Sequence, residues 1–201
     1  MGGVVRPGRD YDLGAVAKPA DSQRLFVAIH PPAEVVERLF EAVAAVNLPP
    51  HRLTPPDQVH LTLLFIGDVP ASELDATVES VRRAAAGLRR FTLTVSGLIA
   101  LPARGTKRLV AAEADRPATL LELQRRLVTR LAGTPRSGRE GDRFLPHFTL
   151  IRFRQPSRLE ALDVELKPAA FVVERITLMR SMLRQEGALH EAAAAIELAD
   201  D

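Results

Sequence analysis

The chain has 201 residues, 46% hydrophobic and 26% charged, a composition typical of a single globular domain. It has no cysteine, which excludes disulfides, thiolate metal sites and cysteine nucleophiles. The formal net charge is only +2, no apolar run reaches the ~20 residues of a membrane helix, and no secretory signal opens the chain, so we expect a cytoplasmic protein without a membrane partner.

Apolar periodicity and turn residues predict the elements of the chain. Residues 1–20 contain several glycines and prolines and no apolar period, so we expect a flexible extension followed by one domain over residues 21–201. In chain order the predicted elements are a strand at 24–30, a helix at 33–46, a strand at 59–67, a helix capped by Ser72 and ending near Gly87, strands at 90–101 and 107–114, a helix at 118–131, a loop at 133–146, a strand at 147–153, a short helix from Pro156, and strands at 171–183 and 189–198. This irregular mixture favours an α+β fold.

The basic residues are unevenly distributed. Between Arg104 and Arg158 there are 13 Lys and Arg against 5 Asp and Glu, a local charge of +8 (13 − 5). This stretch is either a surface that faces a polyanion or a solvated face of arginines.

A His-x-Thr-Leu pattern opens one predicted strand in each half of the chain, at 60–63 and 147–150. Because alternate residues of a strand share a face, each histidine lies on the same face as its threonine, and the apolar residues point to the core. A single histidine of this kind is more often structural, whereas two matched ones favour two similar lobes that share a polar cleft.

Two histidines and two threonines suit the hydrolysis of a phosphodiester. One imidazole can accept the proton of the attacking water while the other donates a proton to the leaving oxygen. Threonine hydroxyls can bind the phosphoryl oxygens as negative charge develops on them. The residues alone leave open which histidine donates and which accepts.

At these motifs the sequence resembles the two-histidine (2H) phosphoesterases, specifically the RNA 2′,3′-cyclic phosphodiesterases once called 2′-5′ RNA ligases. The two HxTx motifs are separated by 87 residues (147 − 60). The similarity extends over about residues 24–198. It is also carried by segments 24–29, 55–59, 143–146 and 176–181, which read RLFVAI, PPDQV, RFLP and ITLMRS.

The resemblance implies a bilobal α+β fold, with two similar lobes of mainly antiparallel sheet, outer helices and an active-site cleft between the lobes. It implies that His60 is the proton donor, that His147 is the proton acceptor, and that Thr62 and Thr149 hold the phosphate. It further implies metal-independent hydrolysis of RNA 2′,3′-cyclic phosphate ends to 2′-phosphate, with weak 2′-5′ ligation and no cofactor. We expect a monomer that binds RNA with such an end, or a cyclic nucleotide.

Arg152 stands where an arginine commonly follows the second motif of this family, which implies a role in substrate binding. It lies five residues after His147, so an unbroken strand would point it to the opposite face unless a twist or bulge intervenes. A salt bridge at the strand end is the alternative interpretation.

The sequence also departs from the family. Leu53, Ala111 and His190 occupy positions where relatives often carry aromatic residues, which puts stacking on the base in doubt. His30 and His51 lie outside both motifs, and we interpret them as structural or solvated.

Three other functions remain open. A 2H phosphoesterase for a small cyclic nucleotide or a 2′-5′ oligonucleotide would need fewer aromatic contacts. An inactive nucleotide- or RNA-binding protein would have kept the cleft without turnover. A histidine metal site is the least supported, because neither motif has an acidic residue beside it.

Overall fold

The computed structural model describes residues 21–131, 144–159, 162, 166–184 and 187–200, and the structural statements below refer to these. The predicted extension at 1–20 and residues 133–143 of the predicted basic loop lie outside them. In chain order the elements are β1 (Ser22–Ile29), α1 (Ala33–Ala44), β2 (His51–Leu53), η1 (Pro56–Gln58), β3 (Leu61–Pro70), η2 (Ala71–Glu73), α2 (Leu74–Ala85), β4 (Phe91–Leu101), β5 (Lys107–Ala114), α3 (Ala118–Leu131), β6 (His147–Ser157), β7 (Ala169–Val173), β8 (Arg175–Arg184) and β9 (Gly187–Glu197).

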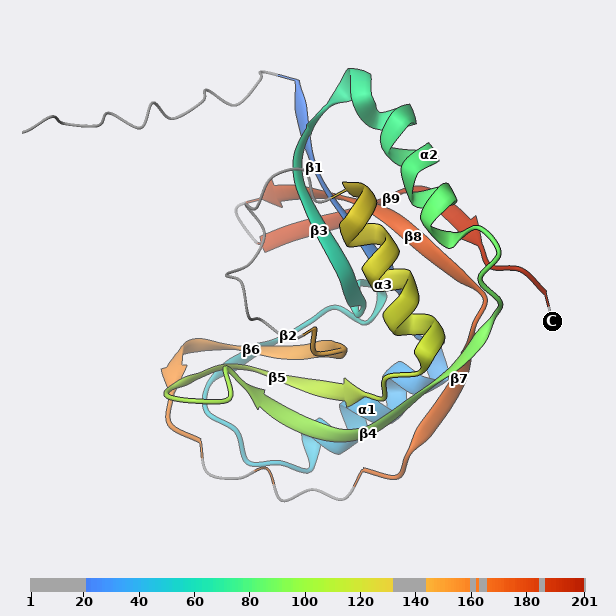
Figure 1. Cartoon of the computed structure of the whole chain (residues 1–201). Helices are drawn as coiled ribbons and strands as arrows, with labels where there is room; N and C mark the ends of the chain where they lie inside the picture. The colour runs from blue at the N-terminus through green and yellow to red at the C-terminus, as the bar shows by residue number, and fades with distance from the viewer. Residues whose placement is uncertain (1–20, 132–143, 160–161, 163–165, 185–186, 201) are drawn as a thin grey trace, which may run out of the picture.

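The strands form one curled antiparallel sheet that divides into two lobes (Figure 1). The strand order is β7-β4-β5-β6-β3-β1-β8-β9, and β2 pairs with β6. Strands β3, β1, β8 and β9 make one lobe, and β6, β5, β4, β7 and β2 make the other. The lobes meet where β3 pairs with β6, through the single register pair Leu61 and Phe148. The predicted bilobal α+β fold is confirmed, whereas the assignment of residues 21–201 to one domain stays a prediction.

The helices bury apolar stripes against the outer face of the sheet. Helix α1 buries residues at helical spacing, namely Val35, Val36, Leu39 and Val43. Helix α3 buries Leu120, Leu123 and Leu127 and packs beside α2 (Figure 1). Each fully buried leucine contributes about 2 kcal/mol relative to an exposed one. The core therefore lies under the helices, on the outer face of the sheet. Among the described helices, none has the length and apolar character that crossing a membrane requires.

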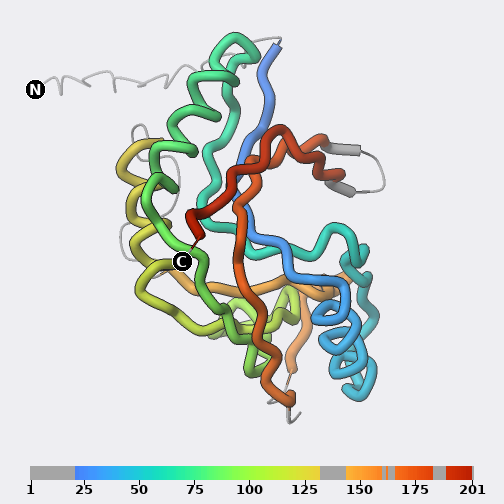
Figure 2. Tube along the Cα trace, turned by 90° about the vertical axis from the view of Figure 1, so that its right-hand side faces the viewer, coloured from blue at the N-terminus to red at the C-terminus, as the bar shows by residue number. Residues whose placement is uncertain are grey.

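The prediction of one strand at 171–183 is wrong. The strand is interrupted at Glu174, and the segments before and after it belong to different lobes. Strand β7 pairs with β4, whereas β8 pairs with β1 and β9. This segment passes from one lobe to the other in Figure 2. The charged pair Glu174 and Arg175 interrupts the apolar alternation at the break, and the buried apolar positions shift from Phe171 and Val173 to Ile176 and Leu178.

Two other local predictions are wrong. Ser72 does not cap α2: it lies in η2, and the N-cap position belongs to Glu73. Pro156 starts no helix, because it belongs to β6, at an irregular part of the ladder with β5 where a residue without an N–H is tolerated. Strand β2, three residues long, was not predicted.

Candidate functional site

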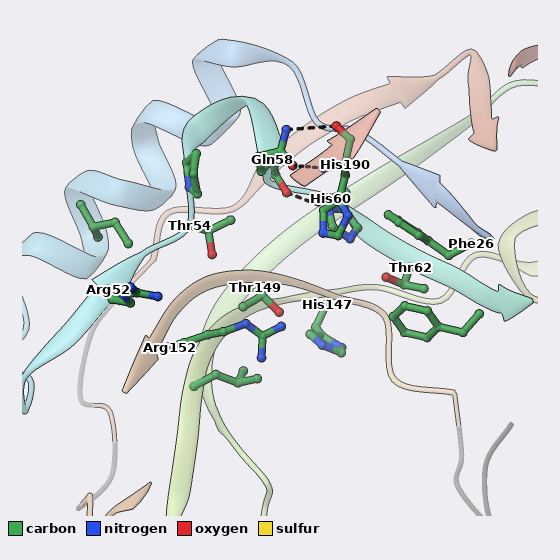
Figure 3. A pocket seen from close by; sticks show the side chains of 14 residues that line it. Phe26, Arg52, Thr54, Gln58, His60, Thr62, His147, Thr149, Arg152 and His190 are labelled. Carbon is green, nitrogen blue, oxygen red and sulfur yellow. Dashed lines mark hydrogen bonds between the residues drawn. The ribbon is translucent and has the colours of Figure 1, made fainter. Parts of the chain in front are cut away.

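A cavity of about 520 Å³ lies between the lobes, and both His-x-Thr pairs line it (Figure 3). The junction of β3 and β6 at Leu61 and Phe148 brings the two motifs together, since each of these residues directly follows a motif histidine. The lining comes from β1, β2, β3, β5, β6, β9 and the β2–β3 connection: Phe26, Arg52, Leu53, Thr54, Pro55, Gln58, His60, Thr62, Phe65, Leu109, His147, Thr149, Arg152 and His190.

A β-bulge in β3 changes which residues face the cavity. Thr62 pairs with Ala28 of β1, but the next pair along β1 joins Val27 to Leu64, which leaves Leu63 as an extra residue. Leu63 and Leu64 are therefore both buried. The side chain of Phe65 then returns to the cavity, 60% exposed.

Strand β6 has the same bulge at the equivalent place. Thr149 pairs with Ala111 of β5 and Ile151 pairs with Val110, so Leu150 is the extra residue. Leu150 and Ile151 are both buried. Arg152 consequently lines the cavity rather than the opposite face.

An unbroken strand would point Arg152 away from the face of His147, and this bulge turns it to the same face. Within the described residues no Asp or Glu forms an ion pair with Arg152. No described acidic residue therefore supports the interpretation of Arg152 as a salt-bridge residue. A substrate-binding role for Arg152 stays a prediction.

Backbone carbonyls hold both motif histidines in the same tautomer. Nδ1 of His60 donates to the carbonyl oxygen of Gln58 at 2.7 Å, and Nδ1 of His147 donates to that of Leu145 at 2.8 Å. A carbonyl can only accept, so each Nδ1 carries a hydrogen. In the neutral rings, Nε2 is therefore the atom that can accept a proton.

The surroundings of His60 favour its neutral form. Burial lowers the pKa of His60 to about 4, the hydrogen bond to Gln58 opposes this, and the positive charges of His190, His30 and Arg152 lower the pKa further. In the ligand-free cleft His60 is therefore unprotonated at neutral pH.

Two of the histidines near His60 were not predicted as part of the site. The His190 ring packs edge-on against His60 at a centroid distance of 5.3 Å and against Phe26 at 4.9 Å. Burial, followed by the charge of Arg152, lowers the pKa of His190. The His30 ring lies 6.0 Å from His60, and burial together with His190 lowers its pKa. His190 could have been predicted as a site residue, because it stands at a position where relatives often carry an aromatic residue. Nothing in the sequence indicated that His30 lies near His60.

Gln58 connects the first motif to strand β9. The backbone N–H of His190 donates to Oε1 of Gln58 at 3.0 Å, and Nε2 of Gln58 donates to the carbonyl of His190 at 3.4 Å. Since the Gln58 carbonyl also holds the ring of His60, one residue links that ring to the backbone of His190. By contrast, His51 bonds through Nδ1 to the carbonyl of Pro49 at 2.8 Å and does not line the cavity, which agrees with a structural role.

The cavity has the charge of an anion-binding site. Its lining contains two arginines and three histidines and no Asp or Glu among the described residues. Arg152 comes from the predicted basic stretch, while Arg52 lies outside it and was not predicted. Leu53, which stands where relatives often carry an aromatic residue, lines the cavity and is 61% exposed. Besides the histidines, the aromatic rings of the lining are those of Phe26 and Phe65.

Residues 29–183 match the family model of the 2′-5′ RNA ligase superfamily. The chain belongs to this superfamily. A Thermus thermophilus relative named RNA 2′,3′-cyclic phosphodiesterase is 34% identical over 174 residues, covering 83% of this chain and 86% of the relative. An Aeropyrum pernix relative of the same name is 29% identical over 173 residues, covering 81% and 94%. The 2H phosphoesterase resemblance is thereby confirmed.

Solved structures of other proteins share the fold. The crystal structure of TT0787 of Thermus thermophilus has a TM-score of 0.73 at 29% identity, covering 87% of this chain and 97% of that one. E. coli LigT complexed with 3′-AMP has a TM-score of 0.71 at 27% identity, covering 89% and 99%.

The described part of the chain offers no candidate metal site. It contains no group of three His, Cys, Asp or Glu side chains placed to hold a metal ion. Metal-independent action stays a prediction, which chelation tests below.

Proposed function

We propose that this protein is an RNA 2′,3′-cyclic phosphodiesterase that opens the terminal cyclic phosphate to a 2′-phosphate by paired histidine acid–base catalysis. The observation that carries the proposal is the pair of HxTx motifs lining one cavity, with both imidazoles held through Nδ1. The names of the relatives support the substrate class. The absence of acidic side chains from the described lining supports an anionic ligand.

In the proposed reaction, water attacks phosphorus and the bond from phosphorus to O3′ breaks. Nε2 of His147 accepts a proton from the water, and protonated His60 donates its Nε2 proton to O3′. Thr62 and Thr149 donate hydrogen bonds to the non-bridging oxygens, and Arg152 offsets their negative charge. The product carries a 2′-phosphate and a free 3′-hydroxyl. A 5′-hydroxyl of a second RNA in place of water would form a 2′-5′ bond, which is the route of the weak ligation that the resemblance implies.

A small cyclic nucleotide is the second candidate substrate. Besides the histidines, the described lining has only the aromatic rings of Phe26 and Phe65. This favours the small cyclic nucleotide, because the unpaired bases of RNA are usually held by stacking. The monomeric state and the cytoplasmic location stay predictions.

The test is hydrolysis of a nucleoside 2′,3′-cyclic phosphate and of a short RNA with a 2′,3′-cyclic phosphate end, each with EDTA present. Turnover of either to the 2′-phosphate supports the 2H mechanism, and the ratio of kcat/KM for the two identifies the preferred substrate. Binding without turnover would indicate an inactive binding protein. Activity that EDTA abolishes and metal restores would contradict the metal-free reaction.

Replacing Thr62 or Thr149 by valine is expected to lower kcat/KM by about 10- to 100-fold, less than loss of a histidine. The reason is that each change removes one hydrogen bond to a charged phosphate, worth about 1.5–3 kcal/mol. Thr92→Val, at an exposed position of β4, is the matched control and should leave kcat/KM unchanged. Wild-type kinetics in either cavity variant would remove that hydroxyl from the mechanism.

A further inference from the structure

Two arginines face each other across neighbouring strands at one end of the cavity. Arg52 of β2 and Arg152 of β6 are register partners, and both line the cavity. Side chains directly opposite in an antiparallel pair lie about 5 Å apart at Cβ, so the two guanidinium groups can contact one ligand. Guanidinium groups bind phosphate oxygens as paired donors, and this end of the cavity therefore suits an anionic group.

The opposite end of the cavity is aromatic. Phe65 holds the position in β3 that Arg152 holds in β6, five residues after the motif histidine and just beyond the same bulge. Its ring lies 5.7 Å from that of Phe26. In Figure 3, Arg52 and Arg152 lie to one side of His60 and His147, and Phe26 lies to the other. Two lobes of similar backbone therefore present different chemistry at the two ends.

A terminal RNA nucleotide, like this cavity, has an aromatic end and a charged end. Its cyclic phosphate spans O2′ and O3′, the base leaves the ribose at C1′ beyond C2′, and the chain continues through C4′ to the 5′-phosphate. The base and the 5′-phosphate thus flank the reacting phosphate on different sides. A phosphate suits the cationic end, because the aromatic end would desolvate its charge without a partner.

We propose that Arg52 is a specificity-determining residue that binds the phosphate on the 5′ side of the terminal nucleotide. This inference rests on the proposed function and deepens it. It makes the substrate class a 2′,3′-cyclic phosphate that bears a 5′-phosphate, as an RNA end does. Arg152, nearer to the motif threonine along β6, stays with the reacting phosphate.

The experiment combines two enzymes with two substrates. Wild type and Arg52→Gln are each assayed on a nucleoside 2′,3′-cyclic phosphate and on the same compound carrying a 5′-phosphate. The 5′-phosphate should raise kcat/KM at least tenfold for the wild type, whereas the ratio should fall close to one for Arg52→Gln. Arg52→Lys, which keeps the charge without the planar fork, should give an intermediate ratio. For cyclic-phosphate-ended RNA, the log–log salt slope of affinity should become shallower by about 0.7 in Arg52→Gln.

Arg154→Gln is the matched control, because Arg154 is an exposed arginine of β6 that does not line the cavity. It should keep the wild-type ratio and salt slope. The inference is overturned if Arg52→Gln keeps the wild-type ratio, including the case in which its turnover of both substrates falls together. If the wild type hydrolyses neither substrate, the proposed function fails instead, so the two failures are distinguishable.

Discussion

Replacing His60 or His147 by alanine is expected to reduce kcat/KM for a 2′,3′-cyclic phosphate by about 10²- to 10⁴-fold, the typical contribution of one positioned acid or base. The reason is that each ring supplies one of the two proton transfers of the proposed reaction. The double variant should lose little more than the worse single variant, because acid and base act on the same transition state. Steady-state kinetics on the purified variants provides the measurement.

His51→Ala is the control for these variants. Its Nδ1 makes the same kind of bond to a carbonyl two residues earlier, but its ring does not line the cavity. It should keep wild-type kcat/KM, and all variants should keep a cooperative thermal transition. If a variant of His60 or His147 turns over like His51→Ala, that histidine has no part in the chemistry.

Local periodicity predicted most of the fold. The strand at 107–114 and the helix at 118–131 occur with the predicted bounds, because their apolar patterns are long and end at clear breaks. The pairing of remote strands was not predictable in the same way. Strand β2 is too short to show a period, and the partners of β7 and β8 are set by tertiary packing.

The candidate site shows the same division. Alternation predicted that His60 shares a face with Thr62 and His147 with Thr149, and all four line one cavity. Beyond the threonines, alternation fails, because a single extra residue in each strand reverses the faces that follow. The cavity positions of Phe65 and Arg152 therefore depend on bulges that the sequence pattern does not reveal.

The electrostatics of His60 could not be predicted from the motif alone. His30 follows β1 and His190 belongs to β9, so their charges reach His60 only once β3, β1, β8 and β9 have assembled into one lobe. Gln58 and His190, which bond to each other, are separated by 132 residues. Burial, followed by the charges of His190, His30 and Arg152, lowers the pKa of His60 despite the hydrogen bond to Gln58, which bears directly on its proposed role as proton donor.

Binding of phosphate is expected to raise the pKa of His60 by roughly three units, from about 4 to near neutrality. One negative charge about 4 Å from the ring, at an effective dielectric constant of about 20, stabilises the imidazolium by about 4 kcal/mol. Since about 1.36 kcal/mol corresponds to one pKa unit, this stabilisation offsets most of the lowering of the pKa that burial causes. The substrate itself would then protonate the donor, and kcat would fall as pH rises through the raised pKa.

The measurement is an NMR titration of the His60 imidazole, assigned with His60→Gln, in inorganic phosphate and in sodium chloride of equal ionic strength. A pKa that rises in phosphate alone supports His60 as the donor; one that stays near 4 with phosphate bound assigns the donor role to His147. A diester with an aryl leaving group, which departs without protonation, separates the roles independently. His60→Ala should recover most of its lost activity on that substrate and His147→Ala should not, because activation of water is still required when protonation of the leaving oxygen is not.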